Sequence, residues 1–234
     1  MKPAQPNKSL MDGIDLLLAL VNVGEPIGVR ELARRVGMET TRCQRLLATL
    51  AVQGMAEQDA DRKYRPGPGI HVLSTMSLAA SGLLQRALPH LRQLAGVAPI
   101  VALGVLWRDE MCYLYHGSGA PDDDQAFGRM THFPATQSAL GMAILAASDP
   151  ERVVMHIGAA QAKGLESQLA EIRLCGYALM PQASQGNQGY SLGVAIGSPV
   201  YAAIGISGAF GPVDAPSLAE QLAAAAAAID QTAH

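Results

Sequence analysis

The first third of the chain carries apolar residues at helical spacing in three successive segments. Residues 9–21 and 32–36 form two stripes, and Gly37 follows the second as a residue that tolerates the left-handed conformation in which helices end. A third stripe spans residues 43–50. Three short amphipathic helices in this order predict a small helical core. The positions that define the stripes are Leu10, Ile14, Leu17, Leu18 and Val21, then Leu32, Ala33 and Val36, then Cys43, Leu46, Leu47 and Leu50.

The opposite face of the third helix is polar, basic and made partly of small residues. At about 100° per residue, Thr41, Gln44, Arg45 and Ala48 point away from the apolar stripe, and Arg42 flanks them. Thr41 and Gln44 also have the spacing of a capping box, which predicts that the Thr41 hydroxyl caps the start of this helix. A face of this composition suits a helix that enters a DNA groove, and it also suits a helix face that is merely solvated.

A basic hairpin follows the third helix. Residues 55–58 and 62–65 predict two strands joined by a turn through residues 59–61. We expect the cations Arg62, Lys63 and Arg65 to lie on the return strand, where they can contact DNA phosphates. Helix, turn, helix and hairpin in this order are typical of a winged helix-turn-helix that binds DNA. Some modules of this kind dock proteins instead, and that alternative stays open.

A cluster of turn residues separates this head from the rest of the chain. Residues 66–69, Pro-Gly-Pro-Gly, end the hairpin and stop any preceding helix. Residues 70–80 and 83–95 then predict two helices, the second of which Pro89 should kink or restart. These patterns predict a DNA-binding domain over residues 1–69, a linker helix over 70–82 and a second domain over 83–234.

The second domain alternates strand and helix patterns. Strands are predicted at residues 100–106 and 111–116, joined through 107–110, and again at 190–196 and 200–207, joined through 197–199. Helices are predicted at 136–147, at 169–177 with an end near Gly176, and at 216–229. The charged run at residues 122–124 is expected to be a solvated loop. The whole chain is therefore expected to have an α+β fold, with a sensor-like α/β domain behind the DNA-binding head.

Composition and charge favour the same division. Residues 1–75 contain ten Lys and Arg against eight Asp and Glu, whereas residues 76–234 contain seven against twelve. A basic head on an acidic body is consistent with DNA contact confined to the head. No segment has the apolar length of a membrane span or a signal peptide, and three cysteines do not suggest a disulfide framework. We therefore expect a cytoplasmic protein with no membrane partner.

The side chains capable of catalysis or metal binding form no recognisable motif. Cys112 and His116 are four residues apart on a predicted strand, which would place them on one face about 13 Å apart, too far for one metal ion. No nucleophile–histidine motif and no phosphate-binding glycine motif is present. We predict no enzyme activity, no catalytic or metal-binding residue and no cofactor. Thiol redox chemistry at Cys112 or Cys175 is the enzymatic alternative.

Seven segments give the chain a resemblance to the IclR family of bacterial transcriptional regulators. The pair RLLATL and YRPG is the most specific of them. The resemblance implies a winged helix-turn-helix, a linker helix and a GAF-like effector-binding domain that forms homodimers or homotetramers. The segments are SLMDGIDLLLAL, VRELARRVGM, TRCQRLLATLAVQG, YRPGPGI, HFPATQSALGMAILA, LAEIRLCGYA and AAIGISG.

The resemblance also implies which residues contact DNA and effector. Double-stranded DNA with an inverted-repeat operator would be contacted by residues of the third helix and of the wing. A small effector would be bound near the start of the helix at 136–147 and after the Gly-Tyr-Ala triplet. The implied DNA contacts are Thr40, Thr41, Arg42, Gln44, Arg45, Arg62, Lys63 and Arg65, and the implied effector contacts are Phe133, Ser138, Ala139, Leu140, Met180, Tyr190 and Leu192.

Two departures from the family pattern bear on the effector. Met180, Pro181 and Gln182 stand where relatives often carry acidic residues, and residues 174–213 contain no charged side chain. Burying an ion without a counter-ion costs several kcal/mol, so this segment favours a neutral ligand. A weakly anionic ligand would have to be held at the helix start near Thr136, with help from Arg129 and His132.

These observations predict a ligand-responsive transcriptional regulator, most simply a repressor of genes for small-molecule catabolism. DNA binding should require at least a dimer, because one short helix contacts too few base pairs for adequate specificity. In the alternative interpretation, the second domain serves only as an oligomerisation platform.

Overall fold

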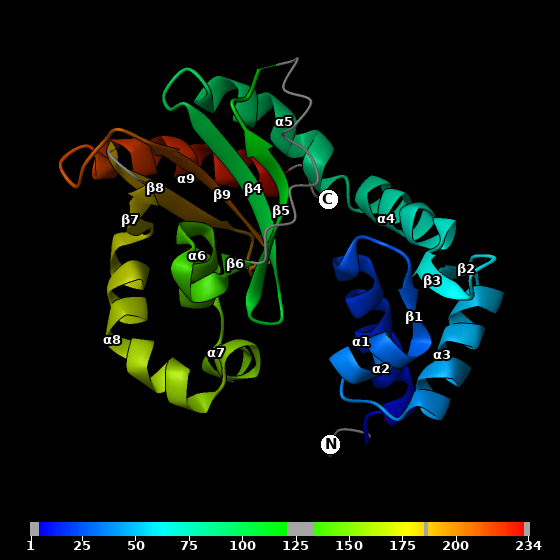
Figure 1. Ribbon diagram of the computed structural model, residues 1–234. Helices are drawn as coiled ribbons and strands as arrows, with labels where there is room; N and C mark the ends of the chain where they lie inside the picture. The colour runs from blue at the N-terminus through cyan, green and yellow to red at the C-terminus, as the bar shows by residue number, and fades with distance from the viewer. Residues whose placement is uncertain (1–4, 121–132, 185–186, 232–234) are drawn as a thin grey trace. The chain divides into compact units, whose positions relative to one another are not determined.

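The computed structural model describes residues 5–120, 133–184 and 187–231, which form two compact units. Unit 1 covers Met1–Ala80 and unit 2 covers Ser81–His234. Figure 1 shows helices packed around a small sheet in unit 1 and helices on both faces of a larger sheet in unit 2. Both helices and strands contribute to the architecture, as an α+β fold requires.

Unit 1 is a three-helix core with a small antiparallel sheet. Its helices are α1 (Lys8–Val23), α2 (Val29–Arg35) and α3 (Thr40–Val52), and its strands pair in the order β1-β3-β2 (Ile27–Gly28, Lys63–Pro66, Ala56–Gln58). Gly37 follows α2 at φ 64°, the left-handed conformation expected there. The core is built on Leu16, Leu20, Leu32, Cys43, Leu47 and Tyr64.

The prediction for the buried face of α1 was wrong. Leu16 and Leu20 are fully buried, whereas Leu10 and Ile14 of the predicted stripe are 65% and 45% exposed and Val21 is also exposed. Because α1 carries apolar residues around most of its circumference, its periodicity did not distinguish the inner face from the outer one. The outer face is left apolar.

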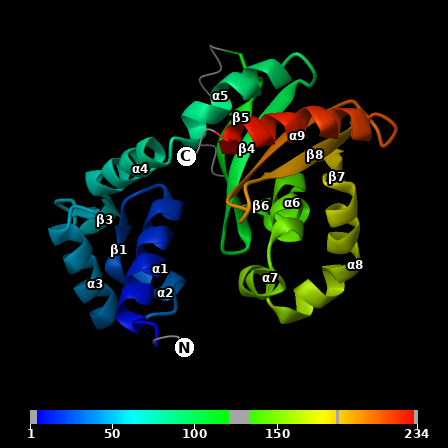
Figure 2. The ribbon, with the colours of Figure 1, turned by 180° about the vertical axis from the view of Figure 1, so that it is seen from behind.

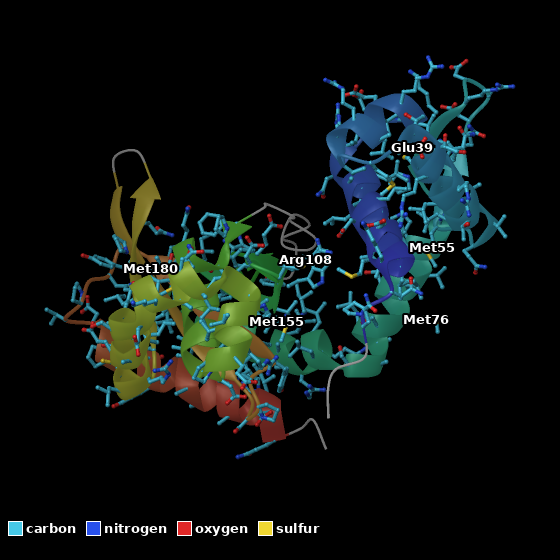
Figure 3. The ribbon with its side chains drawn as sticks, turned by 90° about the horizontal axis from the view of Figure 1, so that it is seen from below. Glu39, Met55, Met76, Arg108, Met155 and Met180 are labelled. Atoms are coloured by element: carbon cyan, nitrogen blue, oxygen red, sulfur yellow. The ribbon has the colours of Figure 1, made fainter. Side chains whose placement is uncertain are left out.

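Helix α4 (Pro68–Ser81) starts within the Pro-Gly cluster, two residues earlier than predicted. Proline is tolerated in the first turn of a helix, since that position needs no N–H donor. None of the large apolar side chains on α4 is buried: Val72, Leu73 and Met76 are all more than half exposed, and Figure 3 labels Met76 on this helix. The helix also has no Asp, Glu, Lys or Arg.

Unit 2 is a six-stranded antiparallel sheet with helices on both faces. The strands lie in the order β6-β5-β4-β9-β8-β7. Figures 1 and 2 show α9 on one face of this sheet and α6 on the other. The strands are β4 (Ile100–Trp107), β5 (Glu110–Gly117), β6 (Phe133–Pro134), β7 (Ala178–Ser184), β8 (Asn187–Ile196) and β9 (Ala202–Gly208).

The helices of unit 2 include two that the sequence pattern missed in whole or in part. Helices α5 (Leu83–Leu94) and α9 (Ala215–Gln231) were expected, and α5 continues through Pro89 without restarting. A short η1 (Ala135–Gln137) leads into α6 (Ala139–Ala147). Helix α7 (Pro150–Ile157) was not predicted, and α8 (Ala159–Cys175) begins ten residues before its predicted start, although it ends at Gly176 as expected.

Two side-chain layers sandwich the sheet. Leu103, Leu192, Val194, Ile204 and Ile206 lie in the core shared with α5 and α9. Alternate residues of the same strands lie under α6, where glycines let the helix approach closely: a Cβ on Gly193 would lie 2.6 Å from the carbonyl carbon and oxygen of Ala139. This close approach fixes the start of α6 on the sheet.

A bulge in β5 overturns the predicted geometry of Cys112 and His116. Gly104 pairs with Tyr113 but Leu103 pairs with Tyr115, so Leu114 is an extra residue and the alternation of faces shifts by one. Cys112 and His116 therefore lie on opposite faces of the sheet, not on one. His116 instead shares a face with Tyr113, and their rings make an edge contact with centroids 5.2 Å apart.

No helix among the described residues is long and apolar enough to cross a membrane.

Candidate DNA interface and effector site

The face of α3 that was predicted to contact DNA is exposed. Cys43 and Leu47 are buried in the core, while Thr40, Thr41, Gln44 and Arg45 are exposed on the other side. This arrangement follows directly from the 3.6-residue period. Four polar or cationic side chains are therefore available to a partner of α3.

The capping prediction for α3 was wrong. The N-cap is Glu39, whose carboxylate accepts hydrogen bonds from the backbone N–H groups of Thr41 and Arg42 at 3.0 and 3.1 Å. Figure 3 labels Glu39 at this helix start. Hydrogen bonds from Thr41, first from its side chain, hold the pKa of Glu39 below its ordinary value. A negative charge thus lies at the N-terminal start of α3, where it interacts favourably with the helix dipole and would repel a phosphate.

Arg42 lies at the edge of the α3 face and is engaged by α1. Its Nη2 is 2.5 Å from Asp12 Oδ2, and its Nε is buried with no hydrogen-bond partner among the described residues. The sequence pattern did not identify Asp12, because no local signal connects residues 12 and 42.

The wing departs from prediction at its turn. Arg62 is in the turn at φ 61°, not on the return strand, and the backbone amide of Lys63 donates to Asp59 Oδ1. A left-handed residue after two turn residues is a common hairpin geometry. Lys63 and Arg65 are both exposed on β3, and Arg65 pairs with Glu57 across the hairpin at 2.9 Å.

In unit 2, the residues predicted to bind an effector do not lie on one surface. Leu192 is fully buried in the core between the sheet and α5 and α9. Tyr190 is two residues from it on β8 and thus faces the same side. Met180 contributes to the core under α6, on the opposite face of the sheet, and Figure 3 labels it on β7. Phe133 lies on β6, at the edge of the sheet beside Met111.

Ser138, Ala139 and Leu140 form the start of α6. Ser138 is only 3% exposed, and its Oγ accepts a hydrogen bond from the backbone N–H of Gly141 at 3.2 Å and lies 2.9 Å from the Tyr113 hydroxyl. Burial raises the pKa of Tyr113, and the hydrogen bond with Ser138 opposes part of that shift. Tyr113 is therefore a neutral hydroxyl, and Ser138 and Tyr113 anchor α6 to β5.

The α6-facing side of the sheet carries a second hydroxyl pair that sequence reasoning missed. Ser191 of β8 and Ser207 of β9 are directly opposite each other, with their Oγ atoms 2.8 Å apart. On the other side of Ser191, Met180 of β7 is its partner in the strand register. The alternation of β8 and β9 contained the signal, but only the register shows that the two hydroxyls meet. We call Met180, Ser191, Ser207 and His116 the serine row. His116 of β5 pairs with Ala102 of β4, two residues from Ile100, which pairs with Ser207.

The serine row is polar but carries no carboxylate and no lysine or arginine. Two serine hydroxyls carry two hydrogens, and one is used between them, which leaves the other to be donated to an outside acceptor. All four side chains of the row are half-buried. The row can therefore hydrogen-bond a ligand oxygen without providing a charged partner.

The hollows in the described part of unit 2 do not include the serine row. One of about 370 Å³ lies between α5 and α9, and another of about 200 Å³ lies beside α6 and α8. Neither is lined by a residue that was predicted to bind the effector. Arg129, His132 and the acidic run at 122–124 lie outside the described residues.

The thiols and metal-binding side chains form no cluster in the described part of the chain. Burial raises the pKa of the Cys43 and Cys112 thiols, whereas Cys175 is exposed. No group of three potential metal ligands occurs among the described residues.

Comparison with known proteins identifies unit 1 directly. Residues 9–60 match the model of the IclR helix-turn-helix domain. The chain is 31% identical over 136 residues to the HTH-type transcriptional regulator BhcR of Paracoccus denitrificans, an alignment that covers 57% of this chain and 49% of that protein. The match thus spans about half the length of this relative.

Solved structures share the fold of nearly the whole chain. A putative IclR transcriptional regulator from Silicibacter sp. TM1040 superposes with a TM-score of 0.76 at 23% identity, covering 96% of each chain. An IclR family regulator from Brucella abortus gives 0.74 at 22%, covering 97% of this chain and 93% of that one. An IclR homologue from Microbacterium hydrocarbonoxydans, solved with 4-hydroxybenzoate, gives 0.67 at 21%, covering 95% and 98%. Residues 9–60 therefore carry a helix-turn-helix domain of the IclR type, and the chain shares its fold with solved structures of IclR-type regulators.

Proposed function

We propose that this protein is a sequence-specific transcriptional regulator, most simply a repressor of catabolic genes, whose DNA binding responds to a small effector. The observation that carries the proposal is the exposed face of α3, which presents Thr41, Gln44 and Arg45 beside a basic wing. A short helix of this composition suits the major groove, and a basic hairpin suits the adjacent phosphates. Thr40, Arg62, Lys63 and Arg65 complete the proposed contacts, with Arg42 at the margin.

The second copy needed for specific binding would use the apolar faces of unit 1. Leu10, Met11 and Ile14 on α1 and Val72, Leu73 and Met76 on α4 are exposed, and α4 has no charged residue. Large exposed apolar surfaces mark interaction sites. We therefore propose a homodimer that presents two α3 helices to an inverted repeat, with a homotetramer as the larger alternative.

The effector site is proposed at the serine row, beside the start of α6. The row supplies hydroxyl and imidazole groups and Met180, with no charged carboxylate or ammonium. A neutral or weakly anionic small molecule with oxygen acceptors fits this chemistry. Of the positions first implied by the family resemblance, Met180 belongs to this row, and Phe133, Ser138, Ala139 and Leu140 lie on or near α6. Leu192 and Tyr190 face the opposite side of the sheet, which α5 and α9 cover.

DNA binding is tested by selecting fragments of sheared genomic DNA at about 150 mM salt and sequencing those retained. A few intergenic inverted repeats would support the proposal, and the neighbouring genes would indicate the class of effector. Equal retention of all fragments would contradict sequence-specific binding.

The effector class is tested by calorimetry with two probes that differ in one charge. Since the Microbacterium homologue was solved with 4-hydroxybenzoate, that acid and its neutral amide, 4-hydroxybenzamide, form a suitable pair. The uncharged row predicts that the amide binds at least as tightly as the acid and that Ser207→Ala weakens both. Tight binding of a dicarboxylate that survives Arg129→Ala and His132→Ala would contradict a neutral site.

A further inference from the structure

Helices α5 and α9 leave a hollow of about 370 Å³ between them. The two helices pack against each other on the face of the sheet opposite the serine row, and Figure 2 shows both on that face. Among the described residues that line the hollow, none is Asp, Glu, Lys or Arg. It is lined mainly by His90, Gln93 and Leu94 of α5 and by Gln221, Ala224 and Ala225 of α9, and we call it the α5–α9 hollow.

The spacing of these residues gives the hollow an apolar floor and two rims. On each helix they stand at positions i, i+3 and i+4, which share one helical face. Leu94 and Ala225 are buried and form the floor, whereas Gln93, Gln221 and Ala224 are exposed at the rims. Because the two alanines carry only a methyl group each, α9 does not fill the space beside α5.

Three uncharged polar side chains converge on this hollow. They are the imidazole of His90 and the carboxamides of Gln93 and Gln221. Within the described part of the chain, none of the three has a hydrogen-bond or ion-pair partner. A carboxamide provides two N–H donors and one oxygen acceptor, and an imidazole provides a donor and an acceptor when neutral. The hollow therefore offers both kinds of hydrogen-bonding group to a ligand, around an apolar floor.

The chemistry of the walls selects a class of ligand. A carboxamide pairs with a molecular edge that carries a donor beside an acceptor, as glutamine does with the N6/N7 edge of adenine. The floor of Leu94 and Ala225 suits the apolar face of a flat ring. Without a charged side chain in the lining, a ligand ion would lose hydration and gain no counter-ion. The volume lies within the roughly 300–1,000 Å³ of small-molecule sites.

We propose that the α5–α9 hollow is a second ligand site, which binds a small, uncharged, planar heterocycle of the purine-base type. Gln93 and Gln221 hydrogen-bond the donor–acceptor edge of the base, and its ring lies over Leu94 and Ala225. The site goes beyond the proposed function, because it lies across the sheet from the serine row and shares no residue with it. A ligand that contacts both helices binds only the folded unit 2 and therefore stabilises it by mass action.

Calorimetric titration of the full-length protein with adenine tests the site. Gln93→Met and Gln221→Met remove the amides at similar size on exposed positions, and each should weaken adenine binding about two- to tenfold, the factor for one net hydrogen bond. Ala224→Leu, at the exposed rim, should abolish binding by filling the hollow. Gln85→Met is the matched control, because Gln85 is exposed on the same helix α5 and does not line the hollow.

A second probe and a second variant make the result specific. Purine has the same rings as adenine without the exocyclic amine, so it should bind less tightly. Adenine binding should persist in Ser207→Ala, since that serine belongs to the row on the other face of the sheet. Loss of binding in Ser207→Ala with retention in Ala224→Leu would overturn the proposal, because adenine would then occupy the serine row. Absence of adenine binding at millimolar concentration, or equal weakening by Gln85→Met, would also overturn it.

Discussion

Arg42 of α3 is held by Asp12 of α1 through an ion pair of 2.5 Å, on the margin of the surface proposed to bind DNA. The pair fixes the orientation of α3 on α1, and it occupies a cation that would otherwise be available to a phosphate. For the proposed DNA contact, we therefore expect two opposite effects of Asp12: it orders the helix, and it competes with a phosphate for Arg42.

Asp12→Asn should separate these effects. We expect the free energy of unfolding to fall by about 0.5–1 kcal/mol, as for a partly exposed pair. We also expect the slope of log affinity against log salt to steepen by about 0.9, because Arg42 becomes available to one phosphate. Titrations of duplex DNA at several salt concentrations measure the slope. Glu25→Gln removes the same charge from an exposed loop, and an equal change in that variant would show that only net charge matters.

Glu39→Ser should keep the cap on α3 and remove its charge. The pKa of Glu39 is lowered, so its stabilising contribution is present above its ordinary value of 4.5 and is lost as the pH falls through the lowered value. Thermal melts between pH 3 and 7 should therefore lose part of their acid sensitivity in this variant. The loss of a carboxylate near phosphate should also tighten DNA binding. Weaker binding by Glu39→Ser would indicate that the carboxylate contacts a base.

Arg45→Ala should weaken DNA binding without unfolding the protein, because the side chain is exposed on α3. A lost base contact would cost roughly 1–3 kcal/mol at the operator and little elsewhere. A lost phosphate contact would weaken all sequences alike. Arg152→Ala, on α7 of unit 2, is the control for a lost cation. Unchanged affinity for every DNA would show that α3 is not the recognition helix.

Gly193→Ala should destabilise unit 2 by about 1–3 kcal/mol. The new methyl group would overlap the backbone of Ala139 and Leu140, and these residues cannot move without lifting α6 from the sheet. Gly164→Ala is the matched control: Gly164 lies within α8 with open space around it, so the substitution should stabilise the protein by roughly 0.5–1 kcal/mol. Denaturant unfolding measures both. Equal stability of Gly193→Ala and wild type would mean that α6 does not depend on this contact.

Local patterns predicted the elements well wherever one face of an element is apolar and the other is not. The stripe through Cys43 and Leu47 on α3 is buried as its period indicated, and the opposite polar face is exposed. In α1 the same reasoning failed, because apolar residues occupy more than one face and only packing into the shared core of unit 1 selects Leu16 and Leu20. Helix α7 was missed because its eight residues provide little more than two turns of signal.

What the sequence by itself determined is the order and type of most elements and the composition of the α3 face, because these depend on residues a few positions apart. The tertiary structure decided which residues meet across the fold. The bulge at Leu114 reverses the face of His116, the strand register joins Ser191 to Ser207, and Asp12 reaches Arg42 from another helix. Such contacts depend on register and packing between distant segments, and no spacing along the chain records them.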